Sequence, residues 1–297
     1  GFWINDGLVM AETLTTLFVA AALLLAVRYR RAPTLRGAVL LGGAVGLAGL
    51  ARAESLLLAP LLIVPVLWST HRAWGDRVAR TLAAGLVTAL VIAPWVVPNL
   101  FRVEEPVAMS TNDGLTLIGA NSPQTYEGSA IGVWSLEYAE TRRPTLPELE
   151  GADPSVESRV WRDEALSFIG DHLDDQPRVM AARLGRLWSV YRPLQMAEWN
   201  TGEGREVWAS NLATLGFYLA GPLAALGWWR LGRSGAMRWP LAVLVVHVCL
   251  IGALFYGIPR FRVPAEIGIV VAAAVGLRWL TSLGPCPRPR TSSSPPP

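Results

Sequence analysis

The stretch Gly49-Leu50-Ala51-Arg52-Ala53-Glu54-Ser55-Leu56 decides how this chain folds, because it sets two opposite charges between apolar runs at 37–51 and 55–68. Each run is shorter than the roughly 20 residues of a membrane-spanning helix, but together they exceed one crossing. Either one long helix carries Arg52 and Glu54 at mid-membrane, or two short helices meet at a charged turn. An ionised side chain near the bilayer centre costs at least about 2.5–3.5 kcal/mol, so we expect these charges to have a structural or functional role.

The composition is typical of a membrane protein. Of 297 residues, 52% are hydrophobic and only 16% are charged, whereas a soluble domain has about 25% charged residues. All 26 basic residues are Arg and lie in short clusters at the ends of apolar runs, which predicts no nucleic-acid partner. The two cysteines, Cys249 and Cys286, have no metal-binding spacing, so we expect neither a metal site nor a disulfide framework from them.

Apolar runs predict an all-α polytopic membrane protein with about seven transmembrane helices. The runs cover residues 8–27, 37–51, 55–69, 81–98, 210–229, 239–257 and 263–281.

The distribution of Arg orients these crossings. Arg gathers in four connecting segments, at 28–36, 72–80, 230–238 and 278–290. If these four segments are cytoplasmic, every crossing alternates correctly and the positive-inside rule holds. The Arg52/Glu54 turn and the segment 99–209 then lie outside a cytoplasmic membrane, together with the turn at 259–262.

We expect four parts. Residues 1–98 form an N-terminal transmembrane part, 99–209 a mixed or helical extracytoplasmic domain, and 210–284 a C-terminal transmembrane part. Residues 285–297 are Pro/Ser-rich and predict a disordered cytoplasmic tail.

The outer segment contains two predicted helices. Asp153-Pro154 reads as an N-cap followed by Pro at the first helical position. A second helix is expected from Pro177, with Arg178, Arg183 and Arg186 on the face opposite its apolar residues. That pattern fits either a helix on the membrane surface or packing against the preceding helix.

Charged residues gather on the outer face. They are Glu12, Arg52, Glu54, Arg260 and Arg262, and polar Asn112 and Asn121 lie in an outer loop.

Arginine on the outer face opposes the usual charge bias, so it needs an anionic partner. A guanidinium group suits the oxygens of a phosphate. The other interpretation is internal ion pairing, of Arg52 with Glu54 or Glu12 and of Arg260 or Arg262 with Glu266. For any single residue both stay open, and for the group on one face we favour a phosphate pocket.

Two histidines receive no functional role. His247 lies inside an apolar run and is interpreted as a satisfied packing residue, and His172 is expected on a solvated helix. Motifs of soluble enzymes, such as a P-loop or a nucleophile elbow, are not found. The glycine-rich piece at 41–46 follows no strand and indicates close helix packing.

Several segments resemble glycosyltransferases of the GT-C class, the membrane enzymes that include protein O-mannosyltransferases and lipid A aminoarabinose transferase. The likeness covers most of the chain, and its specificity comes from the order of its motifs. The matching segments are Leu47–Leu58 around Arg52 and Glu54, Met10–Leu14 around Glu12, Ala93–Asn99 followed by Ser110–Gly114 and Ala120–Pro123, Asp163–Ile169, and Tyr256–Pro264 around Arg260 and Arg262.

The resemblance implies sugar transfer from a polyprenyl-phosphate donor to an extracytoplasmic lipid, glycan or protein acceptor. Arg52, Arg260 and Arg262 would bind the donor phosphate. Orienting or sugar-binding roles would fall to Glu54, Glu12, Asn112 and Asn121. Membrane lipids are expected partners, and no cofactor is specified, which leaves a divalent-metal requirement open.

The sequence departs from the family in two places. The catalytic residue of the family is an Asp in the first outer loop, which is expected upstream of Gly1, so we interpret the chain as an N-terminally truncated fragment and assign no catalytic residue. Asp6 lies in the wrong context to replace it. Pro98 stands where the family has Arg before Asn99.

Two other classes of function remain. A transporter or flippase-like protein would use the same charges as a substrate path, and would show inverted repeats and broken helices. A non-catalytic subunit of a cell-envelope assembly complex would need no base. An acidic outer loop upstream of this sequence would favour the enzyme.

Overall fold

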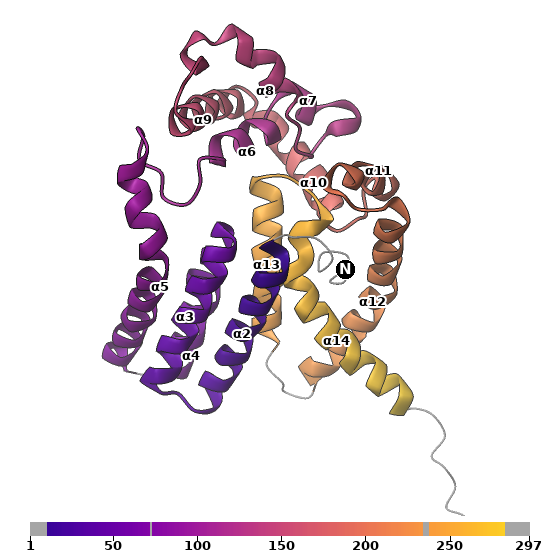
Figure 1. The fold of residues 1–297 in the computed structure, drawn as a ribbon. Coiled ribbons are helices and arrows are strands. Elements are labelled where there is room, and N and C mark those ends of the chain that lie inside the picture. Colours follow the sequence, from indigo (N-terminus) through magenta and orange to yellow (C-terminus); the bar gives the residue numbers. More distant parts are fainter. Residues whose placement is uncertain (1–10, 72, 234–237, 283–297) are drawn as a thin grey trace, which may run out of the picture.

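The computed structural model describes residues 11–71, 73–233 and 238–282. Within these ranges the chain is all-α, with helices and turns but no strand, as the apolar runs predict. Figure 1 shows a layer of long helices and, over one end of it, a cap of shorter helices. Asp6 and the predicted disordered tail at 285–297 lie outside the described residues.

The helical layer is built from the apolar runs. Its elements are α2 (Ala11–Arg31), α3 (Leu35–Ala51), the 3-10 turn η1 (Ala53–Leu57), the π-helical turn η2 (Ala59–Ile63), α4 (Val64–Thr70), α5 (Trp74–Arg102), α12 (Val207–Arg233), α13 (Trp239–Leu254), the 3-10 turn η8 (Pro259–Arg262) and α14 (Val263–Ser282).

Among the described residues, five helical stretches are long and apolar enough to cross a membrane. They are α2, Ala53–Thr70, α5, α12 and Pro259–Ser282. The remaining two expected crossings, α3 and α13, are apolar but have only 17 and 16 residues. The structure is therefore compatible with a multi-pass membrane protein.

Arg52 interrupts the helical path, as the second of the two expected arrangements requires. Helix α3 ends at Ala51, and Arg52 has extended backbone angles, with φ −150° and ψ 120°. The Arg52 carbonyl then accepts a hydrogen bond from the Ser55 amide at 2.9 Å, which starts η1. The two opposite charges consequently lie at a turn between two packed helical segments.

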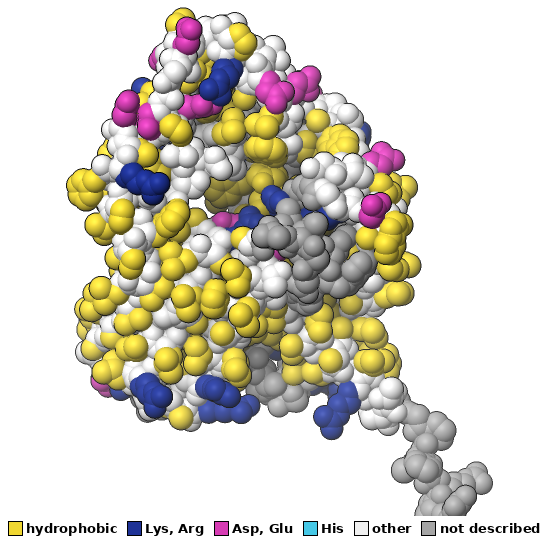
Figure 2. Space-filling model, viewed as in Figure 1, with side chains coloured by type: hydrophobic (Ala, Val, Ile, Leu, Met, Phe, Trp, Pro, Cys, Tyr) yellow, Lys and Arg dark blue, Asp and Glu magenta, His cyan; other side chains and the backbone are white. Residues whose placement is uncertain are grey.

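The two ends of the helical layer differ in charge. Figure 2 shows arginine side chains at the end away from the cap, with a broad apolar band between that end and the cap. At the arginine-rich end, the Tyr29 hydroxyl lies 2.6 Å from His71 Nε2, which joins α2 to the turn before α5. A band of this kind suits a bilayer, with one basic rim.

The cap consists of short helices joined by turns. Its α-helices are α6 (Asp113–Ala120), α7 (Pro123–Tyr126), α8 (Glu137–Arg142), α9 (Pro154–Asp171), α10 (Gln176–Leu187) and α11 (Pro193–Trp199). Asp153 caps α9 by accepting a hydrogen bond from the Ser155 amide at 2.9 Å, which confirms the sequence interpretation. Hydrogen bonds from Ser155 lower the pKa of the Asp153 carboxyl.

Glycines allow the long helices to approach closely. A Cβ atom on Gly227 of α12 would lie 1.7 Å from the Ala272 carbonyl oxygen of α14. On Gly42 of α3 it would lie 2.2 Å from the Ala84 carbonyl oxygen of α5. The interpretation of the glycine-rich piece at 41–46 as a helix-packing surface is confirmed.

Gly227→Ala is expected to destabilise the protein by about 1–3 kcal/mol, because the added methyl group meets backbone that must move. Gly221→Ala on the same helix is the matched control, since its Cβ would have nothing within 4 Å. Alanine is the better helix former, so this control should unfold at or above the wild-type temperature. Thermal unfolding in detergent measures both variants, and equal melting temperatures would contradict the close-packing argument.

Candidate functional site

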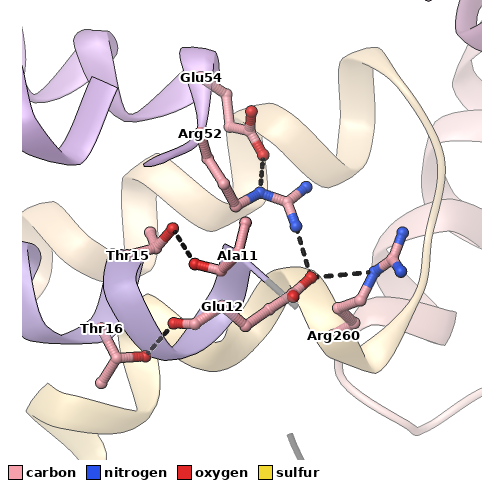
Figure 3. A network of polar contacts seen from close by, with 7 residues as sticks. All are labelled: Ala11, Glu12, Thr15, Thr16, Arg52, Glu54 and Arg260. Atoms are coloured by element: carbon pink, nitrogen blue, oxygen red, sulfur yellow. Dashed lines mark hydrogen bonds and ion pairs between the residues drawn. The ribbon is translucent and has the colours of Figure 1, made fainter. Parts of the chain in front are cut away.

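Glu12 is the centre of a charged cluster, which we call the ion cluster: Glu12, Arg52, Glu54 and Arg260. It lies in the first turn of α2 and is only 3% exposed. Its Oε1 accepts a hydrogen bond from Arg52 Nη1 at 2.6 Å and lies 3.3 Å from Arg260 Nε. One carboxylate therefore holds two guanidinium groups, as Figure 3 shows.

Arg52 joins the two acidic residues of the cluster. Besides its bond to Glu12, its Nε donates to Glu54 Oε1 at 2.5 Å. The Arg52 guanidinium also lies 4.9 Å from the ring centroid of Phe261, which belongs to the turn η8. Arg52 lies at the helix break, so its position depends directly on the interruption that the sequence predicts.

The local sequence explains why these residues meet. Helix α2 begins at the capped end of the layer, where the α3–η1 turn and the turn η8 also lie (Figure 1). Pro259 and Pro264 flank the pair of arginines in η8, and Pro favours the first turn of a helix. The chain thus brings three separate segments to one end of the layer.

A small cavity lies beside the ion cluster. Its free space for the centre of a water molecule is about 10 Å³, which is room for about one water molecule. The two arginines and two glutamates balance in charge, so an anion would enter by replacing a glutamate at a guanidinium group. The cavity is lined by Glu12, Thr15, Arg52, Glu54, Ser55, His247, Ile251, Arg260, Phe261, Val263 and Pro264.

Arg262 lies apart from the ion cluster and is 2% exposed. Its Nε donates to Glu266 at 3.1 Å, and its Nη1 donates to the Leu187 carbonyl at 3.2 Å and to Ser189 Oγ at 3.1 Å. The guanidinium is 3.7 Å from the ring centroid of Phe217. Arg262 therefore ties α14 to α12 and to the end of α10.

Arg260 and Arg262 both line a second cavity, on the side of α11 and α12. Its free space is about 50 Å³, and Arg205 and Glu266 also line it. The arginine pair of η8 is thus divided: Arg260 contacts both cavities, and Arg262 contacts only the second.

The two asparagines lie in different surroundings. Asn112 is exposed and precedes α6. Asn121 is 1% exposed; its amide donates to the Leu117 carbonyl at 2.8 Å, and its Oδ1 accepts from Tyr126 and Arg183. The hydrogen-bonding groups of Asn121 hold the cap together, and neither asparagine lines the cavity beside the ion cluster.

Arg183 and Arg186 are buried on a helix for which the sequence left a membrane-surface and a packed arrangement open. Both lie on α10 and are at most 1% exposed, whereas the sequence pattern groups them with Arg178 on the face opposite the apolar residues. Instead, α10 packs against α13, with Leu187 on Gly252, and turns its arginines into the cap. Packing was one of the two arrangements that the sequence left open, and the main partner of α10 is α13.

These two arginines bind backbone carbonyl groups. Arg183 donates to Ala253 at 3.0 Å and Ala120 at 2.7 Å. Arg186 donates to Ile131 and Ser129, each at 2.7 Å. Burial lowers the pKa of Arg183, and it lowers that of Arg186 to about 10, so Arg186 remains protonated at neutral pH.

No group of three or more His, Cys, Asp or Glu side chains in the described ranges is arranged to hold a metal ion. Figure 2 shows the hollow between the cap and the helical layer, with acidic and basic side chains inside it.

In the part of the chain that the structure describes, the fold is all-helical, is compatible with a multi-pass membrane protein, and carries buried charge under a cap. A 137-residue segment, 45% of the chain, is 26% identical to Angio-associated migratory cell protein of Canis lupus familiaris. The same protein of Pongo abelii gives the same identity and coverage. The matched segment covers 31% of these curated relatives, about a third of their length. No protein-family model and no solved structure matches the chain.

Proposed function

We propose that this chain belongs to a membrane glycosyltransferase that moves a sugar from a polyprenyl-phosphate donor to an extracytoplasmic acceptor. It resides in the cytoplasmic membrane, with α3 and α13 completing seven crossings and the cap on the outer side. The basic end of the helical layer supports this orientation, because arginines concentrate on the cytoplasmic side of membrane proteins (Figure 2).

One observation carries the proposal. The three sequence segments that resemble GT-C enzymes around Glu12, Arg52 and Arg260 are separated by 40 and 208 positions, yet their charged side chains form one cluster. A charge cluster near a membrane needs a compensating role, because ionised groups there are costly. Convergence of motif residues under a cap fits a substrate site better than scattered structural ion pairs.

The reaction has simple chemical requirements. An acceptor oxygen forms a bond to the anomeric carbon while the bond from that carbon to the phosphate oxygen breaks. The acceptor proton passes to a base that we do not assign among the described residues. The electron pair and negative charge leave on the lipid phosphate.

Arg52 and Arg260 would neutralise that leaving charge. Preorganised donors aimed at developing charge are usually the largest single contribution to such catalysis. Glu12 pairs with both guanidinium groups in the structure, and a bound phosphate would replace Glu12 as their partner. Arg262 would fix the η8 turn that carries Arg260, through its bonds to Glu266, Leu187 and Ser189.

Arg260→Ala is expected to lower sugar transfer about 10²–10³-fold, the effect of removing one preorganised donor from developing charge. Membranes containing the full-length protein receive a radiolabelled polyprenyl-phosphate sugar, and transfer to endogenous acceptors is counted. Arg162→Ala, which removes an exposed arginine of the cap paired to Asp113, is the control and should retain wild-type transfer.

Two outcomes would contradict the proposal. Wild-type membranes could transfer no sugar above the empty-vector level, or Arg260→Ala could transfer as fast as wild type. Movement of the lipid-linked sugar across sealed vesicles without transfer would instead favour a transporter.

A further inference from the structure

His247 of α13 is buried without a hydrogen bond. It is 0% exposed, and neither Nδ1 nor Nε2 has a partner among the described residues. The hydroxyl of Ser55 in η1 also has no hydrogen-bond partner among the described residues, and Ser55 is 1% exposed. The interpretation of His247 as a satisfied packing residue is therefore wrong.

Buried polar side chains in folded proteins nearly always have a partner. A lone unsatisfied group is expensive, and here an imidazole and a hydroxyl line the same small cavity. They come from segments almost 200 positions apart and lie beside Arg52 and Glu54 of the ion cluster. Two such groups at one cavity indicate a site built to bind a polar atom.

The chemistry of the two groups restricts what that atom is. A neutral imidazole offers one donor and one acceptor, and a serine hydroxyl also donates and accepts. A phosphate or carboxylate oxygen only accepts, so it would leave the acceptor nitrogen of His247 unsatisfied. A hydroxyl group both donates and accepts and therefore satisfies the imidazole and the serine together.

The size and the lining of the cavity also fit a hydroxyl group. Space for about one oxygen atom admits a hydroxyl group but excludes a sugar ring. Ile251, Phe261 and Val263 supply apolar walls that suit the carbon bearing the hydroxyl. The ring itself would stay on the side of Arg52 and Arg260.

We propose that His247 and Ser55 form a hydroxyl-binding subsite, which positions a sugar by one of its hydroxyl groups beside the ion cluster. This rests on the proposed function and adds a specificity determinant to it. Both are positioning residues: they hold the sugar relative to Arg52 and Arg260 and take no part in bond making.

The test pairs variants with deoxy donors. Transfer by full-length wild type, His247→Leu and His247→Gln is measured with the parent polyprenyl-phosphate sugar and with its mono-deoxy analogues. For one deoxy position, the transfer rate of wild type should be at least about 10-fold lower than its rate with the parent donor. For His247→Leu, the transfer rate with the same deoxy donor should be no more than about 3-fold lower than its own rate with the parent donor. His247→Gln, whose amide both donates and accepts, should recover part of the parent rate.

Ser55→Ala should also transfer the parent sugar and the same deoxy sugar at more similar rates than wild type does. Val248→Ala is the matched control, because Val248 is a fully buried residue of α13 that does not line the cavity. It should keep the wild-type ratio between parent and deoxy donors even if its absolute rate falls.

A second measurement separates binding from packing. In the ligand-free protein, His247→Leu removes an unsatisfied imidazole and should raise the melting temperature by about 2–4 °C. A merely structural histidine would give a lower melting temperature when replaced.

The subsite is overturned if His247→Leu responds to every deoxy donor as wild type does while both transfer sugar. It is also overturned if the variant melts lower than wild type. The proposed function fails separately, when wild type transfers no sugar from the parent donor.

Discussion

Replacing Arg52 with Ala is expected to destabilise the protein by about 2–4 kcal/mol and to abolish sugar transfer. The substitution leaves Glu54 without its partner and leaves the buried Glu12 with Arg260 alone. Removing one member of a fully buried pair costs about 3–5 kcal/mol. The estimate here is lower because the Arg52 side chain is 19% exposed. Thermal unfolding and the transfer assay measure the two effects.

A neutral double variant separates stability from function. Glu12→Gln with Arg52→Gln keeps similar volumes and removes both charges of the Glu12–Arg52 pair. Replacing a buried ion pair as a whole is often neutral for stability. Glu54 loses Arg52 and Arg260 loses Glu12 in this variant, so we expect it to be destabilised, but by less than Arg52→Ala because no charge is left on Glu12. Transfer should be at least about 100-fold lower, because the phosphate charge loses a guanidinium.

Arg143→Ala is the control for loss of an ion pair. Its Nη1 lies 2.5 Å from Glu157 on the cap, and its side chain is 52% exposed. An exposed pair of this kind contributes about 0–1 kcal/mol. If the neutral double variant transfers sugar at the wild-type rate, the ion cluster is structural and the phosphate role of Arg52 is wrong.

The fold was largely predictable because apolar length is a strong physical signal. Runs such as 81–98 and 210–229 correspond to α5 and α12, although these helices extend to Arg102 and from Val207. The number of membrane crossings was harder to predict from the sequence. Helices α3 and α13 have the composition of a crossing but lack its length, and sequence hydropathy alone does not resolve that difference.

The ion cluster was half predicted. Pairing of Arg52 with Glu54 or Glu12 was one of the two alternatives that the sequence left open, and in the structure Arg52 pairs with both. The roles of Arg260 and Arg262 could not be separated, because neighbouring residues of a 3-10 turn point in different directions. Only the tertiary packing shows Arg260 on Glu12 and Arg262 on Glu266.

The surroundings of the buried polar residues could not be predicted from the sequence. His247 lies in an apolar helix, and a satisfied and an unsatisfied histidine have the same sequence context. Arg183 and Arg186 resemble a solvated basic stripe, because their acceptors are backbone carbonyls that carry no residue-type signal. Amphipathic periodicity finds two faces of α10 but does not say which face meets protein.

Arg183→Ala is expected to destabilise the protein by about 3–5 kcal/mol and to loosen the cap. Arg183 Nη1 donates to the Ala253 carbonyl at the end of α13, and Nη2 donates to the Ala120 carbonyl at the end of α6. Carbonyl groups at helix ends lack intrahelical partners. Each one left buried and unpaired costs about 1–3 kcal/mol, and the charged hydrogen bonds are lost as well.

The cap should detach from the helical layer at this point first. Just after α13, the Gly257 amide donates a hydrogen bond to the Gly132 carbonyl of the cap at 2.8 Å, and both glycines lie against Arg183. Limited proteolysis in detergent should therefore cut the cap of Arg183→Ala at least about 10-fold faster than that of wild type, because cleavage follows the population of the open form.

Arg178→Ala isolates the effect of burial from that of charge, since Arg178 lies on the same helix with a 54% exposed side chain. A surface change of this kind should stay within about 0.5 kcal/mol of wild type. Arg183→Lys should fall between the two, because a single ammonium group does not reach both carbonyls with the fork of a guanidinium. Equal proteolysis rates for Arg183→Ala and Arg178→Ala would show that the cap is held by its apolar contacts instead, and that the buried arginine is not what couples it to α13.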